Sequence, residues 1–418
     1  MNTLTRRQFM KLGAASATAT LGLSAGYGFS TEISPQRKEK EMSLTTSQEK
    51  KPVGKMNQVK INELTRKFEK MIKDGLHPGA QLCVYYQDEL VIELVGGLDS
   101  PGGRPVTNQT LYQIRSTTKA LATIAMLMLY EKHHFAFEDP VAKHWPKFGT
   151  KGKQSITIAQ VMSHSAGIPD GPMIPPDKLG DRKAVAAAVE AMEPIWPPGT
   201  ANGYHAATFG WVLDELVYRW EGRNISRFIE EEVIKPLGLK NIFIGLPPGE
   251  FSRMAKMMVE GGVRERQDTR ARFSDFLNTP EGMSLPLAWV GGVATARDLA
   301  HLMNILAYEG TYASRTFFSK QTQEKAAQPQ NPPEVNDRRL TLPIRWGLGF
   351  IVGTTPRIYG DRLNPRVVGH AGGSACVAWA DPDLKLSVAF LTNRMTGMNT
   401  AFDRFKEIGN KVYECVKI

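Results

Sequence analysis

The most restrictive feature of this sequence is a long apolar segment that directly follows a serine and a lysine. Ile114 to Lys119 reads Ile-Arg-Ser-Thr-Thr-Lys, and the residues from Ala120 to Tyr130 are mostly apolar. The apolar residues that recur with helical spacing are Leu121, Ile124, Ala125, Met128 and Leu129. A helix that is apolar on nearly all sides belongs in the protein interior. The sequence therefore predicts a buried helix with Ser116 at its start.

Ser116 and Lys119 are three residues apart, so a helical start would place both side chains on one face. A serine hydroxyl needs a neighbouring base to become a nucleophile, and a lysine deprived of water can act as one. The pattern alone is weak, because Ser47 and Lys50 repeat it in a polar segment. The alternative interpretation is a helix cap at Ser116 and a solvent-exposed lysine. Context must decide between the two.

Composition and charge exclude several function classes. The chain has 418 residues, of which 42% are hydrophobic and 22% charged, as in soluble globular enzymes. Residues 1–60 hold ten Lys or Arg against four Glu, so +6 of the net charge of +10 lies there, and we expect no nucleic-acid partner. Cys83, Cys376 and Cys415 show no C-x-x-C spacing, and the eight histidines form no H-E-x-x-H motif. We therefore expect neither a disulfide framework nor a metal or other cofactor.

The N-terminal region is interpreted as a leader and a linker. Arg6 and Arg7 are followed by Phe9 and a modest apolar stretch, which resembles a twin-arginine export signal over residues 1–30. A basic tail is the alternative. Residues 31–55 are polar and charged, which is typical of a disordered linker, and the folded domain should span 56–418. These features predict a periplasmic or secreted protein with no stable membrane span after leader removal.

The remaining pattern predicts strands near both ends of the chain and helices between them. Helices are expected at 57–73, 156–166, 182–192, 209–218, 225–234, 295–306 and 400–416. Strands are expected at 79–86, 90–95, 346–352, 367–379 and 384–391. This order favours an α/β protein of the α+β type. Its antiparallel sheet would be built from both chain ends and flanked by helices, with a helical lobe at about 139–309.

Three remote segments occur in an order that resembles one enzyme superfamily. Ser116 and Lys119 open a helix, Tyr204 follows a Pro-Gly pair at 198–199, and His-Ala-Gly-Gly occupies 370–373. From about residue 57 to 417 the chain resembles the serine β-lactamase-related hydrolases, which include class C β-lactamases, penicillin-binding DD-peptidases and family VIII carboxylesterases. The resemblance implies a β-lactamase/transpeptidase-like fold.

The resemblance also implies a role for each residue of these motifs. Ser116 would be the acylated nucleophile, Lys119 its base, and Tyr204 the second member of a proton-shuttling pair. Gly373 would provide an oxyanion N–H beside that of Ser116, and Gly372 would let the backbone approach the substrate. His370 is expected to bind either Tyr204 or the substrate. We expect another histidine, His164, to bond loop backbone rather than to act as a base.

Two departures from the β-lactamase pattern point to the esterase branch. The usual Tyr-x-Asn is Tyr204-His205-Ala206, and the usual Lys-Thr-Gly is His370-Ala371-Gly372, so an amide and a fixed cation are lost. These changes favour uncharged acyl groups and predict an exported serine carboxylesterase that acts on a small-molecule ester. The alternatives are a β-lactamase or D-Ala-D-Ala carboxypeptidase, and a non-catalytic scaffold of the same fold. The sequence predicts no oligomeric state.

Overall fold

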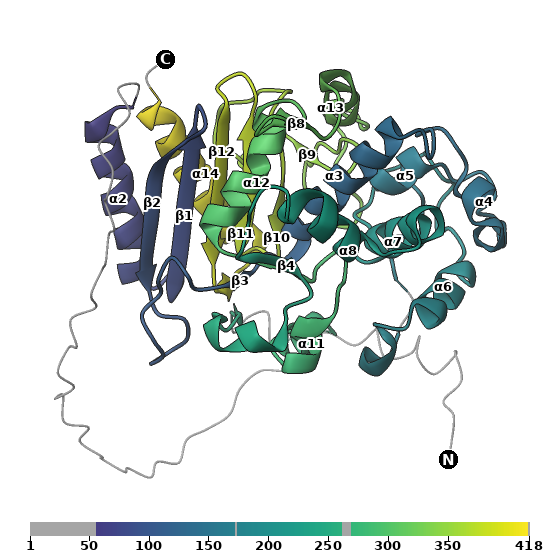
Figure 1. The fold of residues 1–418 in the computed structure, drawn as a ribbon, viewed down its shortest axis with the longest axis horizontal. Coiled ribbons are helices and arrows are strands. Elements are labelled where there is room, and N and C mark those ends of the chain that lie inside the picture. The colour runs from purple at the N-terminus through teal and green to yellow at the C-terminus, as the bar shows by residue number, and fades with distance from the viewer. Residues whose placement is uncertain (1–55, 172–173, 261–268, 417–418) are drawn as a thin grey trace, which may run out of the picture. The chain divides into compact units, whose positions relative to one another are not determined.

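The computed structural model describes residues 56–171, 174–260 and 269–416 (Figure 1). The predicted leader at 1–30 and linker at 31–55 lie outside the described residues. Within the described part, no helix combines the length and the apolar character needed to cross a lipid bilayer.

A six-stranded antiparallel sheet in the order β2-β1-β12-β11-β10-β9 forms the centre of the fold. Strand β1 pairs with β12 from Ala80 opposite Thr392 to Tyr86 opposite Leu386, which joins the two ends of the chain. The predicted antiparallel sheet built from both ends is therefore confirmed. The strands are β1 (Gly79–Tyr86), β2 (Glu89–Gly97), β9 (Ile351–Val352), β10 (Val368–Gly372), β11 (Cys376–Asp381) and β12 (Leu386–Thr392).

Helices cover both faces of this sheet, because side chains alternate along each strand. Leu82 and Val84 pack in one core with helices α2 (Gln58–Lys73) and α14 (Met398–Cys415), while Cys83 packs in the other core with α12 (Ala296–Ala307). Figure 1 shows α12 in front of the sheet and α14 behind it. The sheet is thus buried on both sides, as a strand of continuous apolar residues requires.

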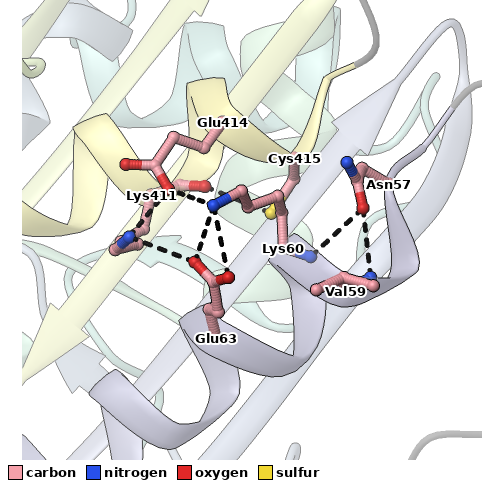
Figure 2. A network of polar contacts seen from close by, with 7 residues as sticks. All are labelled: Asn57, Val59, Lys60, Glu63, Lys411, Glu414 and Cys415. Atoms are coloured by element: carbon pink, nitrogen blue, oxygen red, sulfur yellow. Dashed lines mark hydrogen bonds and ion pairs between the residues drawn. The ribbon is translucent and has the colours of Figure 1, made fainter.

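Polar contacts join the first and last helices of the described chain (Figure 2). The Asn57 backbone N–H donates to the Cys415 carbonyl at 2.8 Å, and the Asn57 side chain caps α2. Lys60 forms ion pairs with Glu63 at 3.0 Å and with Glu414 at 3.6 Å. Surface ion pairs contribute little free energy, so the apolar faces of the two helices supply most of the stability here.

The middle of the chain is mainly helical, and it includes α3, the helix that directly follows Ser116 (Figure 1). Three short strands also form a small sheet, so the lobe expected at 139–309 is not purely helical. These strands are β3 (Tyr112–Gln113), β4 (Ile242–Ile244) and β6 (Gly292–Ala294). The helices are α3 (Thr118–Glu131), α4 (Val141–His144), α5 (Ile158–Met162), α6 (Arg182–Glu190), α7 (Thr208–Glu221), α8 (Ile225–Ile229), α10 (Thr269–Phe276), α11 (Pro280–Ser284) and α13 (Lys320–Ala327).

Two pairs of short strands complete the described secondary structure. β5 (Met258–Val259) pairs in parallel with β13 (Arg394–Met395), and β7 (Thr311–Tyr312) pairs with β8 (Arg315–Thr316). The parallel pair attaches the segment after β12 to the middle of the chain. This parallel pair therefore lies just beyond the end of β12.

Several predicted elements are shorter than expected, because residues with positive φ interrupt them. The strand predicted at 346–352 is confined to β9, since Gly349 has φ +82° and Trp346 folds back to bridge Ile351. The strand predicted at 367–379 is a hairpin of β10 and β11, with φ +56° at Ser374. The helix predicted at 156–166 is confined to α5, which ends at Met162, and His164 with φ +60° lies beyond it.

Candidate active site

Ser116 lies in a 3₁₀ turn, Arg115–Thr117, between β3 and α3. Its side chain is half-buried, and the position before α3 is taken by Thr117, so Ser116 is not the cap of that helix. The Thr118 hydroxyl donates to the Arg115 carbonyl at 2.5 Å and accepts from the Gly292 N–H at 2.9 Å. These bonds hold the turn against β6 and fix the position of Ser116.

Lys119 is fully buried, so the alternative of a solvent-exposed lysine is wrong. Its Nζ donates to the Trp289 carbonyl at 3.1 Å and lies 4.9 Å from the ring centroid of Tyr204 and 5.7 Å from that of Phe209. Burial lowers the pKa of Lys119 well below its usual value. The neutral amine that a general base requires is therefore much more accessible than in a free lysine.

Tyr204 is brought to Lys119 from a segment just before α7. Its backbone N–H donates to Asp337 Oδ1 at 3.1 Å, and its ring stacks on Trp346 at a centroid distance of 5.5 Å. The stack and the backbone bond orient the ring so that the Lys119 amine lies over it. The structure thus places the lysine and the tyrosine of the predicted shuttle in contact.

The end of β10 lies against the turn that carries Ser116. The Thr117 hydroxyl donates to the His370 carbonyl at 3.3 Å, and the Cys376 thiol donates to the Ile114 carbonyl at 3.0 Å. A Cβ at Gly372 would lie 2.2 Å from the Ile114 oxygen, so a residue with a side chain cannot approach this closely. Gly373 follows with φ +55° and packs beside Arg115. Both predicted glycines therefore lie next to the Ser116 turn.

His370 lies within β10, and its side chain is buried. Its Nδ1 donates to the Ala371 carbonyl at 2.7 Å, and its Nε2 has no hydrogen-bond partner among the described residues. Its ring centroid is 6.3 Å from that of Tyr204. Burial and the nearby Lys119 lower the pKa of His370 to about 3, so it is neutral at physiological pH. A neutral imidazole thus occupies the position where β-lactamases carry a lysine.

His164 does bond loop backbone, as expected, but it also packs against the candidate site. Its Nδ1 accepts from the His205 backbone N–H at 3.2 Å, and its ring lies 5.0 Å from Tyr204 and 4.3 Å from Trp346. Burial, with the nearby His205 and Lys119, lowers its pKa well below the usual value, so it too is neutral. Trp289 and Trp346 also contact the candidate site, and the sequence did not predict this. The only sequence signal for either residue is the glycines that follow it.

The buried histidines predict that stability falls in mild acid. Burial lowers the pKa of His77 and His370 to about 3 and that of His205 to about 4, against about 6.5 in an unfolded chain. Because the unfolded chain binds more protons between these values, stability falls as pH drops from about 6.5 to 4, by up to about 1.4 kcal/mol per pH unit for each histidine. The melting temperature should therefore decrease steeply from pH 7 to pH 5.

A variant remote from the motifs provides the control for this pH effect. His77→Gln keeps an acceptor for Arg404 Nη1, which lies 3.3 Å from His77 Nδ1, but cannot take up a proton. Its melting temperature should depend less on pH than that of the wild type. An equal pH dependence in the two proteins would show that His77 does not titrate on unfolding as its burial requires.

Within the described residues, no group of three or more His, Cys, Asp or Glu side chains has the arrangement of a metal site.

The fold is that of serine hydrolases with the β-lactamase/transpeptidase-like architecture. The chain belongs to the Beta-lactamase family, whose family model matches residues 64–411. This finding confirms the resemblance inferred from the three motifs. It also agrees with an antiparallel sheet flanked by helices.

Individual relatives include esterases and a penicillin-binding protein homologue. Esterase/beta-lactamase LipL of Mycobacterium tuberculosis is 25% identical over 364 residues, which cover 79% of this chain and 81% of LipL. A solved family VIII carboxylesterase is 26% identical, with a TM-score of 0.74 and coverage of 86% of this chain and 97% of its own. A penicillin-binding protein homologue from Caulobacter crescentus is 28% identical, with a TM-score of 0.72 and coverage of 88% and 100%.

Proposed function

We propose that this protein is a carboxylic ester hydrolase that works through an acyl-enzyme on Ser116. The observation that carries the proposal is the contact between Tyr204 and a Lys119 amine buried next to the Ser116 turn. A buried cation without an acidic partner is costly, so a scaffold protein would gain nothing from keeping this lysine. A general base gains a lowered pKa from the same burial.

Each residue has a defined part in the proposed reaction. Lys119 and Tyr204 take the proton of the Ser116 hydroxyl as its Oγ attacks the ester carbonyl and forms a tetrahedral intermediate. The N–H groups of Ser116 and Gly373 stabilise the oxyanion. The C–O bond to the alcohol then breaks, and Tyr204 returns the proton to the leaving alkoxide. Water activated by the same pair hydrolyses the acyl-enzyme and restores the Ser116 hydroxyl.

The surroundings of the pair favour an ester over a β-lactam or a D-Ala-D-Ala peptide. The buried, neutral His370 replaces the lysine of the Lys-Thr-Gly motif, and His205 and Ala206 replace the residues that complete Tyr-x-Asn. His205 is buried, with Nε2 accepting from the Ile168 N–H at 3.0 Å, so it cannot replace the missing amide in binding a substrate. A family VIII carboxylesterase among the structural neighbours supports the same class of reaction.

Covalent labelling and a substrate comparison test this proposal. A fluorophosphonate probe should add its mass to the peptide that contains Ser116 and should not label a Ser116→Ala variant. Short-chain p-nitrophenyl esters should be hydrolysed faster than a chromogenic cephalosporin. Faster opening of the cephalosporin would instead indicate a β-lactamase, and absence of labelling would contradict an acyl-enzyme on Ser116.

A further inference from the structure

The residue directly before the nucleophile is an arginine in an unusual state. Arg115 has φ +51°, a conformation that bulky residues rarely adopt, and only 4% of the residue is exposed. One terminal nitrogen, Nη2, donates to Ser274 Oγ and lies 3.0 Å from Met395 Sδ. Neither of these partners carries a charge. Among the described residues, no Asp or Glu forms an ion pair with this guanidinium.

The unused N–H groups of Arg115 lie beside the oxyanion glycine. A Cβ built on Gly373 would be 3.1 Å from Arg115 Cγ and 3.5 Å from Nε, so the guanidinium stem runs along this glycine. Nε is sealed from solvent and has no hydrogen-bond partner, and Nη1 makes no hydrogen bond to any described residue. Leaving the buried Nε–H without a partner costs free energy, so this arrangement is poorly satisfied without a ligand.

Arg115 remains a cation while its neighbours in the site are neutral. Burial lowers its pKa to about 10, which leaves it protonated at physiological pH, whereas His370 is neutral there. A buried cation without an acidic partner in the protein favours an acidic partner in the ligand.

We propose that Arg115 binds a carboxylate of the substrate, so that the preferred esters carry a negative charge near the scissile carbonyl. This inference rests on the proposed ester hydrolysis at Ser116. It revises the expectation of uncharged acyl groups, which followed from the missing lysine at position 370. The cation comes instead from the residue that precedes the nucleophile. A guanidinium binds a carboxylate through strong charge-assisted hydrogen bonds, and Nη1 is the nitrogen of Arg115 that remains free for one.

Matched ester pairs test the charge preference. On the acyl side, mono-p-nitrophenyl glutarate is compared with p-nitrophenyl valerate, and on the alcohol side, 4-carboxyphenyl butyrate with phenyl butyrate. In one of the pairs the anionic ester should have a kcat/KM at least about tenfold higher than the neutral one, as expected for a charged hydrogen bond. Preference for the neutral ester in both pairs would overturn the proposal.

Variants then assign that preference to Arg115. Arg115→Met should bring the anionic-to-neutral ratio close to 1, and Arg115→Lys should keep part of it because the charge remains. Arg366→Met removes the same charge at a residue that pairs with Asp383 at 2.5 Å, and it should leave the ratio unchanged. An unchanged ratio in Arg115→Met would contradict the assignment. Should that variant not fold, the wild-type ratio and the Arg115→Lys variant still decide.

A binding experiment separates this inference from the proposed function. Ser116→Ala protein should bind monomethyl glutarate in calorimetry, and the Ser116→Ala/Arg115→Lys double variant should bind it more weakly. If the wild type cleaves no ester while this difference persists, the proposed hydrolysis fails and the carboxylate site stands. If esters are cleaved and neither ester pair nor binding depends on the carboxylate, the hydrolysis stands and the carboxylate site fails.

Discussion

Ser116→Ala is expected to lower kcat for short-chain p-nitrophenyl esters by about four orders of magnitude or more, as removal of a serine nucleophile does in other serine hydrolases. Ser116 is half-buried in a turn held by Thr118, Gly292 and the end of β10, so the backbone that carries its hydroxyl is held in place. Loss of the hydroxyl removes the atom that would form the acyl bond, and the remaining groups can only polarise the carbonyl. Initial rates measured with high enzyme concentrations give the residual turnover.

A second serine variant controls for the effect of removing a hydroxyl. Ser226 lies on α8, and its hydroxyl donates to the Ile244 carbonyl at 2.5 Å. Neither residue belongs to the three motifs. Ser226→Ala should reduce the melting temperature slightly and leave kcat within about threefold, because a lost hydrogen bond costs about 1 kcal/mol of stability. Comparable turnover in Ser116→Ala and the wild type would exclude Ser116 as the nucleophile.

Periodicity made the scaffold predictable, because it reports burial directly. The mostly apolar run after Lys119 predicted α3, and the strand segments near both chain ends predicted the central sheet. The misses occur where single residues adopt positive φ. Gly349 and Ser374 turn the chain inside segments whose apolar pattern alone favours continuous strands. Gly372, Gly373 and Ser374 are themselves typical turn residues, but the apolar residues on both sides of them favoured one continuous strand.

The motif residues of the site were predictable, but their partners were not. Ser116, Lys119 and Tyr204 belong to motifs with fixed local spacing, whereas the carbonyl that binds Lys119 comes from Trp289, far along the chain. Such a partner depends on how β6 packs against the Ser116 turn, which no local pattern records. The same holds for Trp346, whose ring stacks on Tyr204. Sequence therefore predicted which motif residues meet in the candidate site better than it predicted their surroundings.

Lys119→Met is expected to lower kcat by about three orders of magnitude, because it removes the base that accepts the Ser116 proton. Methionine has a similar length and no charge, so it fits beside Tyr204 and Phe209 without leaving a cavity. The pH dependence gives a sharper result. The base acts when deprotonated, so kcat/KM in the wild type should rise with pH and level off well below the usual lysine pKa, which burial lowers. This limb should be absent in Lys119→Met.

Lys153 provides the matched control, since it is also fully buried and donates to main-chain carbonyls, those of Thr150 at 3.0 Å and Glu190 at 2.9 Å. Lys153→Met should lower the melting temperature, because three main-chain carbonyls lose their charged donor, and should leave the shape of the pH–rate profile unchanged. A pH limb that persists in Lys119→Met would assign the base to another group. Both lysines are buried, and of the two only Lys119 lies one helical turn from Ser116, so the pair of variants separates burial of a lysine from the proposed role as base.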